Sequence, residues 1–421
     1  MPDFLPFVGI RYDVTRLAEA GAGGPGDVGA VAAPPYDVID EDDRTALEAA
    51  HPQNSVRLIL PRADGSRDPY QAAADTMAAW LDDGILVADD EPRFYLYGID
   101  FEDEAGRPRH THGVIGALAL PGETSSPSVL PHERTMPRTK SDRLALLQAT
   151  RANLDPIWCL SLASGLSDLL EREGEELASC VDGEGIRHHL RALADDSHTT
   201  RIAEAVAGAP VVIADGHHRF ETACAYRDEL LAAGRDDPGG ARIMAFIVEL
   251  ADDELFVRAI HRVLTGLGGV DPRAALAAAF EVVGTGPNTP EGVAALTNRM
   301  RQEGGLGLVD SGGLALLVPR PDVLEPALAA VDEPVREVDA TVFDLGVRPH
   351  LPADVDVGYR SDAAVVAALV EKGVTEAAVL LRPVTVGQIR AAAFAGARMP
   401  EKTTYFHPKP RTGMVFRSLD R

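Results

Sequence analysis

Residues 215–219 (DGHHR) are five consecutive residues rich in chemically active side chains, and they follow a short apolar segment. The apolar segment, VVI at 211–213, predicts a buried strand, and the apolar spacing from 220 to 231 predicts a helix that ends at Gly234. Unpaired N–H groups in the first helical turn can bind an anion, and Arg219 adds a bidentate donor for phosphate or carboxylate. The sequence therefore predicts an anion-binding strand–turn–helix, with Asp215 as the cap of the helix.

A purely structural explanation covers the same residues. Asp215 would then only cap the helix, Arg219 would only pair with it, and His217 and His218 would be polar surface residues. We favour a functional site, because Asp, His, His and Arg gather within five residues at the end of a buried strand. On this interpretation Asp215 and His217 are catalytic candidates, and Gly216, His218 and Arg219 hold phosphate.

Two other segments concentrate basic residues in an otherwise acidic chain. They are LPHERTMPRTKSDRLALLQATR at 130–151 and MPEKTTYFHPKPRTG at 399–413. Such runs are ordinarily a solvated loop and a disordered tail, but aromatic residues in the second can anchor it against the body of the protein. We interpret both as anion-binding segments. Their candidate phosphate or substrate contacts are His132, Glu133, Arg134, Lys140 and Arg143 in the first, and Lys402, Thr403, Thr404, His407, Lys409 and Arg411 in the second.

A third candidate segment is VAAPPYDVID at 31–40, in which two prolines fix an extended backbone before Tyr36 and Asp37. Asp40 is expected to cap a helix over 41–50. Asp37 is either a turn former or a catalytic carboxylate, and the sequence supports both equally. Tyr36 is a candidate substrate contact.

His110 and His112 would lie on one face of a strand, which is the minimum for two metal ligands. The sequence offers no third ligand nearby, so we expect an exposed hairpin edge, and metal ligands remain unassigned.

The motifs that are absent narrow the chemistry. The chain has no G-x-x-x-x-G-K-[ST] P-loop, no kinase-fold motifs and no G-x-S-x-G nucleophile elbow. The three polar clusters instead suggest a small polyanion such as phosphate or pyrophosphate. Phosphoryl transfer at such a site needs anion donors, a base and usually a divalent cation, and Asp37 and Asp215 could serve as base and as metal or substrate anchor.

Composition sets broad limits on partners and location. The 421 residues are 45% hydrophobic and 25% charged, as in an ordinary soluble globular protein, and the net charge is −25. This charge argues against nucleic acid or an anionic membrane as the main partner. Three scattered cysteines and the lack of a signal peptide or a long apolar run predict a cytoplasmic protein. A homo-oligomer is an option that the sequence leaves open.

The apolar patterns along the chain predict alternating strands and helices. Strands are expected at 55–60, 93–101, 112–120, 153–162, 187–193, 243–250 and 255–264, and helices at 41–50, 69–82, 142–150, 166–177 and 197–206. A glycine-rich break at 266–269 suggests a boundary. We predict a catalytic region at 1–265, a second α/β domain at 266–398 and a terminal segment at 399–421 that returns to the active site.

Four segments in order resemble a known family. They are APPYDVI at 33–39, LPHERTMPRTKSDRLALLQATRANLDPI at 130–157, VIADGHHRFETACAYRDE at 212–229, and MPEKTTYFHPKPRTG at 399–413. Nearly the whole chain resembles the domain-of-unknown-function family numbered 1015, most weakly between 266 and 399. That family is similar to the ParB/sulfiredoxin-like superfamily, in which a strand–turn–helix with a G-x-x-R core binds nucleotide or phosphate, and to which free-serine kinases belong.

The resemblance implies an α/β (α+β) fold with a ParB/sulfiredoxin-like catalytic core, an additional C-terminal α/β domain and a tail that returns to the core. It implies a small-molecule kinase that converts L-serine to O-phospho-L-serine with pyrophosphate, ADP or ATP as donor and Mg²⁺ as cofactor. Sulfiredoxin has a cysteine where this chain has His217, so its repair chemistry is not expected. Two alternatives are a non-catalytic phosphometabolite or nucleotide sensor and a metal-dependent phosphohydrolase.

Overall fold

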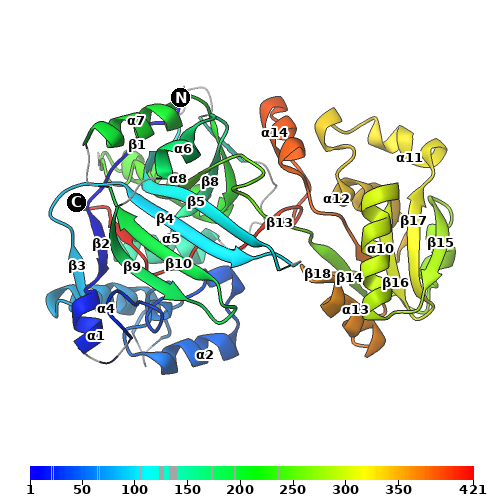
Figure 1. Ribbon diagram of the computed structural model, residues 1–421, viewed down its shortest axis with the longest axis horizontal. Helices are drawn as coiled ribbons and strands as arrows, with labels where there is room; N and C mark the ends of the chain where they lie inside the picture. The colour runs from blue at the N-terminus through cyan, green and yellow to red at the C-terminus, as the bar shows by residue number, and fades with distance from the viewer. Residues whose placement is uncertain are drawn as a thin grey trace. The chain divides into compact units, whose positions relative to one another are not determined.

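The computed structural model describes residues 1–19, 21, 23–63, 65, 67–104, 106–122, 128–131, 140–171, 174–193, 196–235 and 237–421 (Figure 1). The fold is mixed α/β, as predicted, and the chain forms two compact units. The first unit contains the described residues up to 256 together with 408–421, and the second contains 257–407.

The first unit is built on a large mixed sheet. Its described strands run in the order β6-β11-β8-β12-β5-β4-β10-β9, with β1 also paired to β5. Their bounds are β1 Phe4–Leu5, β4 Tyr95–Glu102, β5 Pro108–Ala119, β6 Val129–Pro131, β8 Ile157–Ser161, β9 Glu175–Val181, β10 Arg187–Ala192, β11 Val211–Asp215 and β12 Arg242–Glu249. β11 pairs parallel with β6, β12 pairs parallel with β8, and the other neighbours are antiparallel. The predicted hairpin is therefore confirmed as β4–β5.

The helices α2 and α4 of the first unit each begin at an aspartate that caps the first turn. Asp40 and Asp43 form a reciprocal capping box at the start of α2, and Asp68 caps α4, which has proline at its first position. The described helices are α1 Val14–Glu19, η1 Tyr36–Val38, α2 Glu41–Ala50, α3 Val56–Ile59, α4 Pro69–Asp82, α5 Lys140–Thr150, α6 Leu166–Leu170, α7 Asp196–Ala207 and α8 His217–Ala232.

The core of this unit lies between the central strands and the helices α7 and α8. Ile157 of β8 and Ile213 of β11 belong to a buried cluster with Phe220 of α8 and Val206 of α7. Fully burying side chains of this size stabilises the fold by about 1.5–3 kcal/mol each. The strand β11 and the first turns of α8 are therefore fixed by the core, and so is the turn between them.

A smaller sheet places the C-terminal residues in the first unit. Its strand order is β3-β2-β21-β7, with bounds Leu86–Ala88, Gly9–Tyr12, Phe416–Ser418 and Ala152–Asn153. Phe416 is fully buried, and an isolated bridge pairs Thr412 with Ala33. Residues 408–418 thus run beside the proline-rich segment that leads to Asp37.

The second unit has an antiparallel six-stranded sheet in the order β15-β17-β16-β19-β14-β18 and a two-stranded pair, β13 with β20. Helices α10 and α13 contribute Leu296, Met300 and Val366 to its core. The strands are β13 Val257–Arg258, β14 His261–Thr265, β15 Phe280–Gly286, β16 Leu306–Asp310, β17 Gly313–Pro319, β18 Asp356–Arg360, β19 Ala377–Leu380 and β20 Tyr405–Phe406. The helices are α9 Pro272–Leu276, α10 Pro290–Glu303, α11 Pro321–Leu328, η3 Glu333–Val335, α12 Asp339–Val342, η4 Phe343–Val347, η5 Arg348–His350, α13 Ala363–Glu371 and α14 Val386–Ala395.

Contacts divide the chain near residues 256 and 407, because β14 pairs with strands of the second unit and β20 pairs with β13. The boundaries inferred from sequence, after 265 and 398, remain a proposal.

Two predicted elements are wrong. Residues 55–60 contain the helix α3 and not a strand; Asn54 accepts a hydrogen bond from the Val56 N–H at 2.9 Å, which starts the turn. Val56, Leu58 and Ile59 are buried, and so short an apolar run has no periodicity that separates strand from helix. The predicted helix at 166–177 ends with α6 at Leu170, and β9 begins at Glu175 because it pairs with β10.

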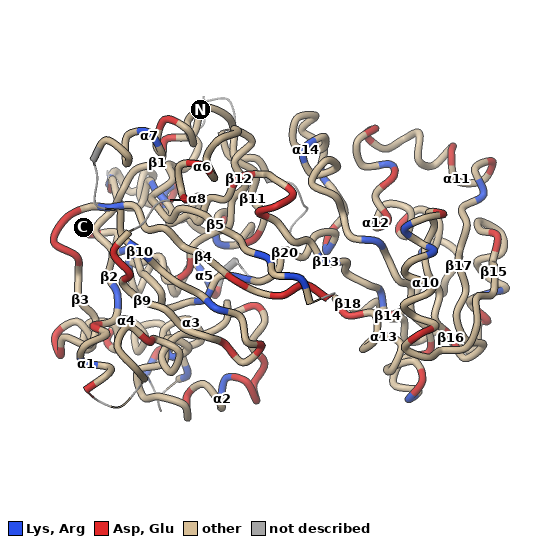
Figure 2. The backbone as a smooth tube through the Cα atoms, viewed as in Figure 1, with Lys and Arg blue, Asp and Glu red and all other residues tan. Residues whose placement is uncertain are grey.

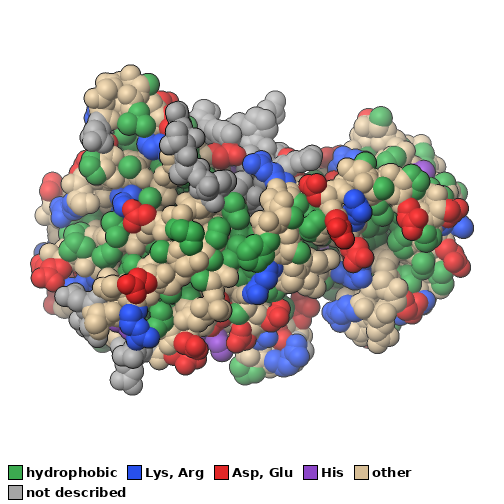
Figure 3. Space-filling model, turned by 90° about the horizontal axis from the view of Figure 1, so that it is seen from above, with side chains coloured by type: hydrophobic (Ala, Val, Ile, Leu, Met, Phe, Trp, Pro, Cys, Tyr) green, Lys and Arg blue, Asp and Glu red, His purple; other side chains and the backbone are tan. Residues whose placement is uncertain are grey.

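Charged residues of both signs are distributed over the two units (Figure 2), and they are interspersed on the face shown in Figure 3. Among the described residues, no helix combines the length and the apolar character that crossing a membrane requires.

Candidate active site

The turn between β11 and α8 is made by a glycine in the left-handed region. Gly216 has φ 92° and ψ 25° and occupies the N-cap position of α8 without a side-chain cap. The prediction that Asp215 caps this helix is wrong, because the chain turns one residue later than expected. The Asp215 carboxylate instead accepts from Arg219 Nη2 at 2.8 Å and lies 3.0 Å from Lys409 Nζ.

Arg219 is fixed by contacts on two sides. Its Nη1 donates to the Pro156 carbonyl oxygen at 2.5 Å, while Nη2 donates to Asp215. A Cβ atom on Gly216 would lie 3.0 Å from Arg219 Nε and Nη2, so the glycine also makes room for the guanidinium. The guanidinium is therefore held in one orientation at the N-terminal end of α8.

Lys409 joins two carboxylates that are far apart in sequence. Its Nζ lies 2.5 Å from Asp37 Oδ2 and 3.0 Å from Asp215 Oδ1. The segment is held in register by Thr412, whose N–H donates to the Ala33 carbonyl at 2.9 Å and whose carbonyl accepts from the Ala33 N–H at 3.0 Å. The proline-rich segment and the C-terminal segment together place Asp37 and Lys409 at the β11–α8 turn.

The ion pairs shift the pKa values of both partners. Burial alone would raise the pKa of Asp215, but Lys409 and Arg219 hold it well below its ordinary value. Burial would lower the pKa of Lys409, but Asp215 and Asp37 hold it above its ordinary value. Asp215 is therefore a weak base, and its part in the site is to hold two cations in place.

Asp155 is a further carboxylate of the site, and sequence reasoning missed it. Burial raises its pKa, although Arg219 and a hydrogen bond from the Thr412 hydroxyl act in the opposite direction. Asp155 comes immediately before Pro156 and the buried strand β8. An aspartate that precedes a proline next to a core strand was the signal available in the sequence.

A small pocket lies beside these groups. Tyr36, Arg143, Asp155, Arg219 and Thr222 are among the residues that line it. The Arg143 guanidinium stacks on the Tyr36 ring, with 4.3 Å between its Cζ atom and the ring centroid. Arg143 also donates to the Ile59 carbonyl at 2.7 Å, so it shapes the wall of the pocket.

Three buried polar atoms around the first turns of α8 lack a hydrogen-bond partner among the described residues. They are His218 Nδ1, Arg219 Nε and Thr222 Oγ1. Buried polar atoms in native proteins nearly always have a partner. A ligand with several oxygen atoms would supply partners to such a set.

The other predicted residues fall into four groups. His217 is the first residue of α8. Arg411 lies elsewhere in the first unit, where its N–H donates to Tyr97 Oη at 2.9 Å and its Nη1 lies 4.0 Å from Asp182 Oδ2. Lys402, Thr403, Thr404 and His407 belong to the second unit, so their place at this site stays a prediction. His132, Glu133 and Arg134 lie outside the described residues, and Lys140 begins α5, where only its backbone is described.

Comparisons with known proteins identify the family. The solved structures that resemble this chain include a free serine kinase in complex with AMP (TM-score 0.36, 13% identity, 66% of this chain and 83% of that chain). They also include a conserved hypothetical protein from Pyrococcus furiosus (TM-score 0.36, 13% identity, 70% of this chain and 93% of that chain). A third is SbnI from Staphylococcus aureus with a C-terminal truncation (TM-score 0.34, 11% identity, 70% of this chain and 84% of that chain). No curated protein matches the chain. The model of the family described as Protein of unknown function (DUF1015) matches residues 4–341, so the chain belongs to the DUF1015 family.

Proposed function

We propose that this protein is a phosphotransferase that phosphorylates free L-serine to O-phospho-L-serine, with pyrophosphate or a nucleotide (ADP or ATP) as donor. The observation that carries the proposal is the position of Lys409 between Asp37 and Asp215, beside Arg219 and the N-terminal turn of α8. The transfer of a phosphoryl group requires fixed cations and backbone N–H groups that together stabilise the negative charge on its oxygen atoms.

The donor phosphates would be bound by Lys409, Arg219, His218 and the N–H groups at the start of α8. Arg219 Nε and His218 Nδ1 are buried donors or acceptors that a phosphate oxygen can satisfy. Because Asp37 and Asp215 hold Lys409 and Arg219 before a ligand binds, little reorganisation is needed when the donor arrives.

We assign Asp155 as the general base. Its raised pKa makes it a stronger base than an ordinary aspartate, whereas the lowered pKa of Asp215 makes that carboxylate a poor one. The serine hydroxyl oxygen forms a bond to the donor phosphorus while the bond to the leaving phosphate or nucleotide oxygen breaks. The hydroxyl proton passes to the Asp155 carboxylate.

The side chains at this site are compatible with Mg²⁺. The two cations, Lys409 and Arg219, are balanced by Asp37 and Asp215, so a bound polyanion adds negative charge that the pairs do not offset. Mg²⁺ commonly uses one or two carboxylates together with phosphate oxygens and water, and the partly exposed Asp37 can supply one ligand. Bound Mg²⁺ would neutralise charge on the donor phosphates.

The proposal is tested by incubating the full chain with L-serine, Mg²⁺ and pyrophosphate, ADP or ATP in separate reactions, followed by mass spectrometry for phosphoserine. We expect phosphoserine with at least one donor and none with the Asp215→Asn variant. Release of phosphate at the same rate with and without serine would favour the hydrolase alternative. Donor binding without any turnover would favour the sensor alternative, and either result would overturn the proposal.

A further inference from the structure

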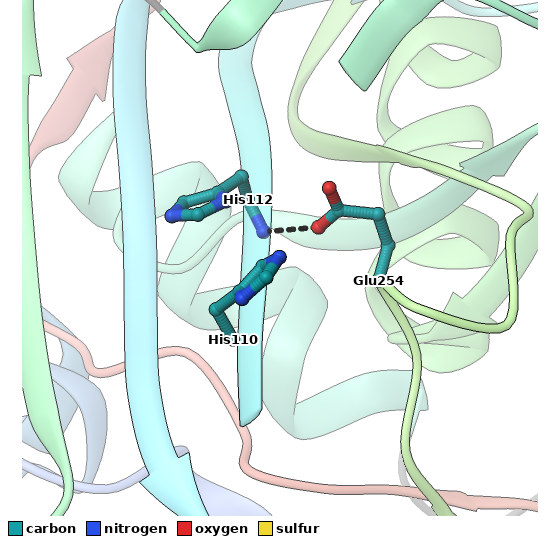
Figure 4. Close-up of side chains that lie close together, drawn as sticks. All are labelled: His110, His112 and Glu254. Carbon is teal, nitrogen blue, oxygen red and sulfur yellow. Dashed lines mark hydrogen bonds between the residues drawn. The ribbon is translucent and has the colours of Figure 1, made fainter. Parts of the chain in front are cut away.

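A second group of chemically active side chains lies on β5, away from the residues assigned above. His110 and His112 occupy alternate positions of this strand and project from the same face (Figure 4). Their rings are stacked, with centroids 4.7 Å apart and planes inclined by 28°. Glu254 approaches them from the loop after β12, and potential ligand atoms of the three side chains lie within 4.8 Å of one another.

The position of Glu254 is set by the edge of the sheet. β12 pairs with β5 only as far as Val248 and Gly113, so the β5 edge before Gly113 is not covered by β12. Glu254 supplies hydrogen-bond acceptors to this part of β5. Its Oε2 accepts from the His112 N–H at 2.8 Å, and its carbonyl oxygen accepts from the Thr111 hydroxyl at 2.8 Å. The carboxylate is thereby directed toward the two imidazoles.

Further contacts hold the same loop against β5. Arg109 Nη2 donates to the Asp252 carbonyl at 2.8 Å and to the Leu255 carbonyl at 3.1 Å. Glu254 is 5% exposed, whereas His110 is exposed. Two candidate ligands thus lie on a strand, and a third, buried one lies on a loop that hydrogen bonds hold against β5. The exposed His110 leaves one side of the cluster open to solvent.

A third imidazole borders the cluster. Gly98 of β4 pairs with both His112 and His189, and a Cβ on Gly98 would overlap the His189 ring. The absence of that side chain lets His189 lie over β4, with its ring centroid 6.3 Å from that of His112. His189 Nδ1 is 3.6 Å from Asp100 Oδ2.

We propose that His110, His112 and Glu254 bind a divalent first-row transition-metal ion, with Zn²⁺ the preferred ion and water completing its coordination. Two imidazoles and a carboxylate favour Zn²⁺ over Mg²⁺ or Ca²⁺, which prefer oxygen ligands. Ligand bonds of about 2.0–2.2 Å require the three ligand atoms, which lie within 4.8 Å of one another, to approach by side-chain rotation. This inference does not rest on the phosphotransferase proposal.

The test is a Zn²⁺ titration of the full chain after treatment with a chelator, read by calorimetry and by elemental analysis after gel filtration. We expect one equivalent of Zn²⁺ in the wild type. His112→Ala and Glu254→Gln should each weaken binding by about 100-fold or more, since outer-shell changes alone cost 10–100-fold. Titration with Co²⁺ should give the visible absorption of a four- or five-coordinate ion.

His51→Ala is the matched control, because His51 follows the last residue of α2 and its ring Nδ1 accepts from the Gln53 N–H at 3.2 Å. His110 is exposed, so His110→Ala tests the site with the least disturbance to the fold. Circular dichroism compares the fold of all four variants with that of the wild type. Failure of the wild type to bind Zn²⁺ would overturn the proposal. So would equal affinity in the wild type and the three cluster variants, or an equal loss in the His51 control.

Discussion

Lys409 Nζ lies 2.5 Å from Asp37 Oδ2, although the two residues are 372 positions apart in the chain. The same Nζ lies 3.0 Å from Asp215, so one ammonium group ties the proline-rich segment to the β11–α8 turn. Removing a partner from such a buried or half-buried ion pair lowers the free energy of unfolding, because the remaining charge has no counter-ion. The geometry thus ties local stability to the proposed function through the same three residues.

Replacing Lys409 should lower kcat, in addition to the stability that is lost when Asp37 and Asp215 no longer share a cation. Lys409→Met removes the cation that we assign to the donor phosphates, and kcat should fall by about 100-fold or more, as when one preorganised donor to a transition-state charge is lost. Lys372→Ala, an exposed lysine at the end of α13, should leave kcat unchanged. Steady-state phosphoserine formation measures both, and equal kcat in the wild type and Lys409→Met would count against the assignment.

Gly216→Ala should disturb the position of Arg219. Both Gly216 (φ 92°) and Gly234 (φ 68°) adopt left-handed conformations at opposite ends of α8, so alanine at either position should cost about 1–2 kcal/mol. A Cβ at Gly216 also meets Arg219, whereas a Cβ at Gly234 has no heavy atom within 4 Å. Thermal unfolding should show similar losses, but only Gly216→Ala should raise the KM for the donor. Equal KM values would contradict the role of Arg219.

The acid stability of the first unit should depend on Asp215. Because its pKa is lower in the folded state, its stabilising contribution is present above the unfolded pKa of about 3.9 and is lost as pH falls toward the folded pKa. Trp80 and Trp158 both lie in the first unit, so tryptophan fluorescence reports its unfolding. The difference in unfolding free energy between wild type and Asp215→Asn should shrink below pH 4. A difference that stays constant from pH 7 to pH 3 is not compatible with this ion-pair arrangement.

Asp155 should set the acid limb of the pH–rate profile. Asp155→Asn should lower kcat by about 100-fold or more, because proton transfer by a positioned base contributes that much. The wild-type rate should fall as pH drops through the raised pKa of Asp155.

Thr412 provides a finer test of the same assignment. Its hydroxyl lowers the pKa of Asp155, so Thr412→Val should move the acid limb to higher pH, and Thr412→Ser should retain the wild-type profile. A profile that does not move in Thr412→Val, with the fold intact, would point to another base.

The parts of the site that follow from local patterns were predictable from sequence. The alternation of β11, turn and α8 was visible because a buried β-branched run precedes a helical apolar spacing. The capping box at Asp40 was visible for the same local reason. What depends on long-range packing was not predictable. Asp155 reaches the site because β8 pairs with β11. Glu254 reaches His112 because the pairing of β12 with β5 stops at Gly113 and leaves the first residues of β5 uncovered.

The positions of the ion pairs were likewise beyond the sequence. The run DGHHR suggests a cap at Asp215, and only the left-handed Gly216 moves the helix start by one residue. Arg411 and Lys409 are neighbours in one basic segment, yet one side chain lies near Asp182 and the other at Asp215. Residue type alone does not distinguish them, because their directions are set by the pairing of Thr412 with Ala33.

We propose that the serine hydroxyl oxygen attacks a donor phosphorus at the Asp215–Lys409 pair. The decisive experiment uses L-serine labelled with ¹⁸O in its hydroxyl group, followed by ³¹P NMR of the product. We expect phosphoserine whose bridging oxygen carries the label, formed by the wild type and not by Asp215→Asn. Unlabelled phosphoserine, or labelled serine left unchanged with every donor, would overturn the proposed attack.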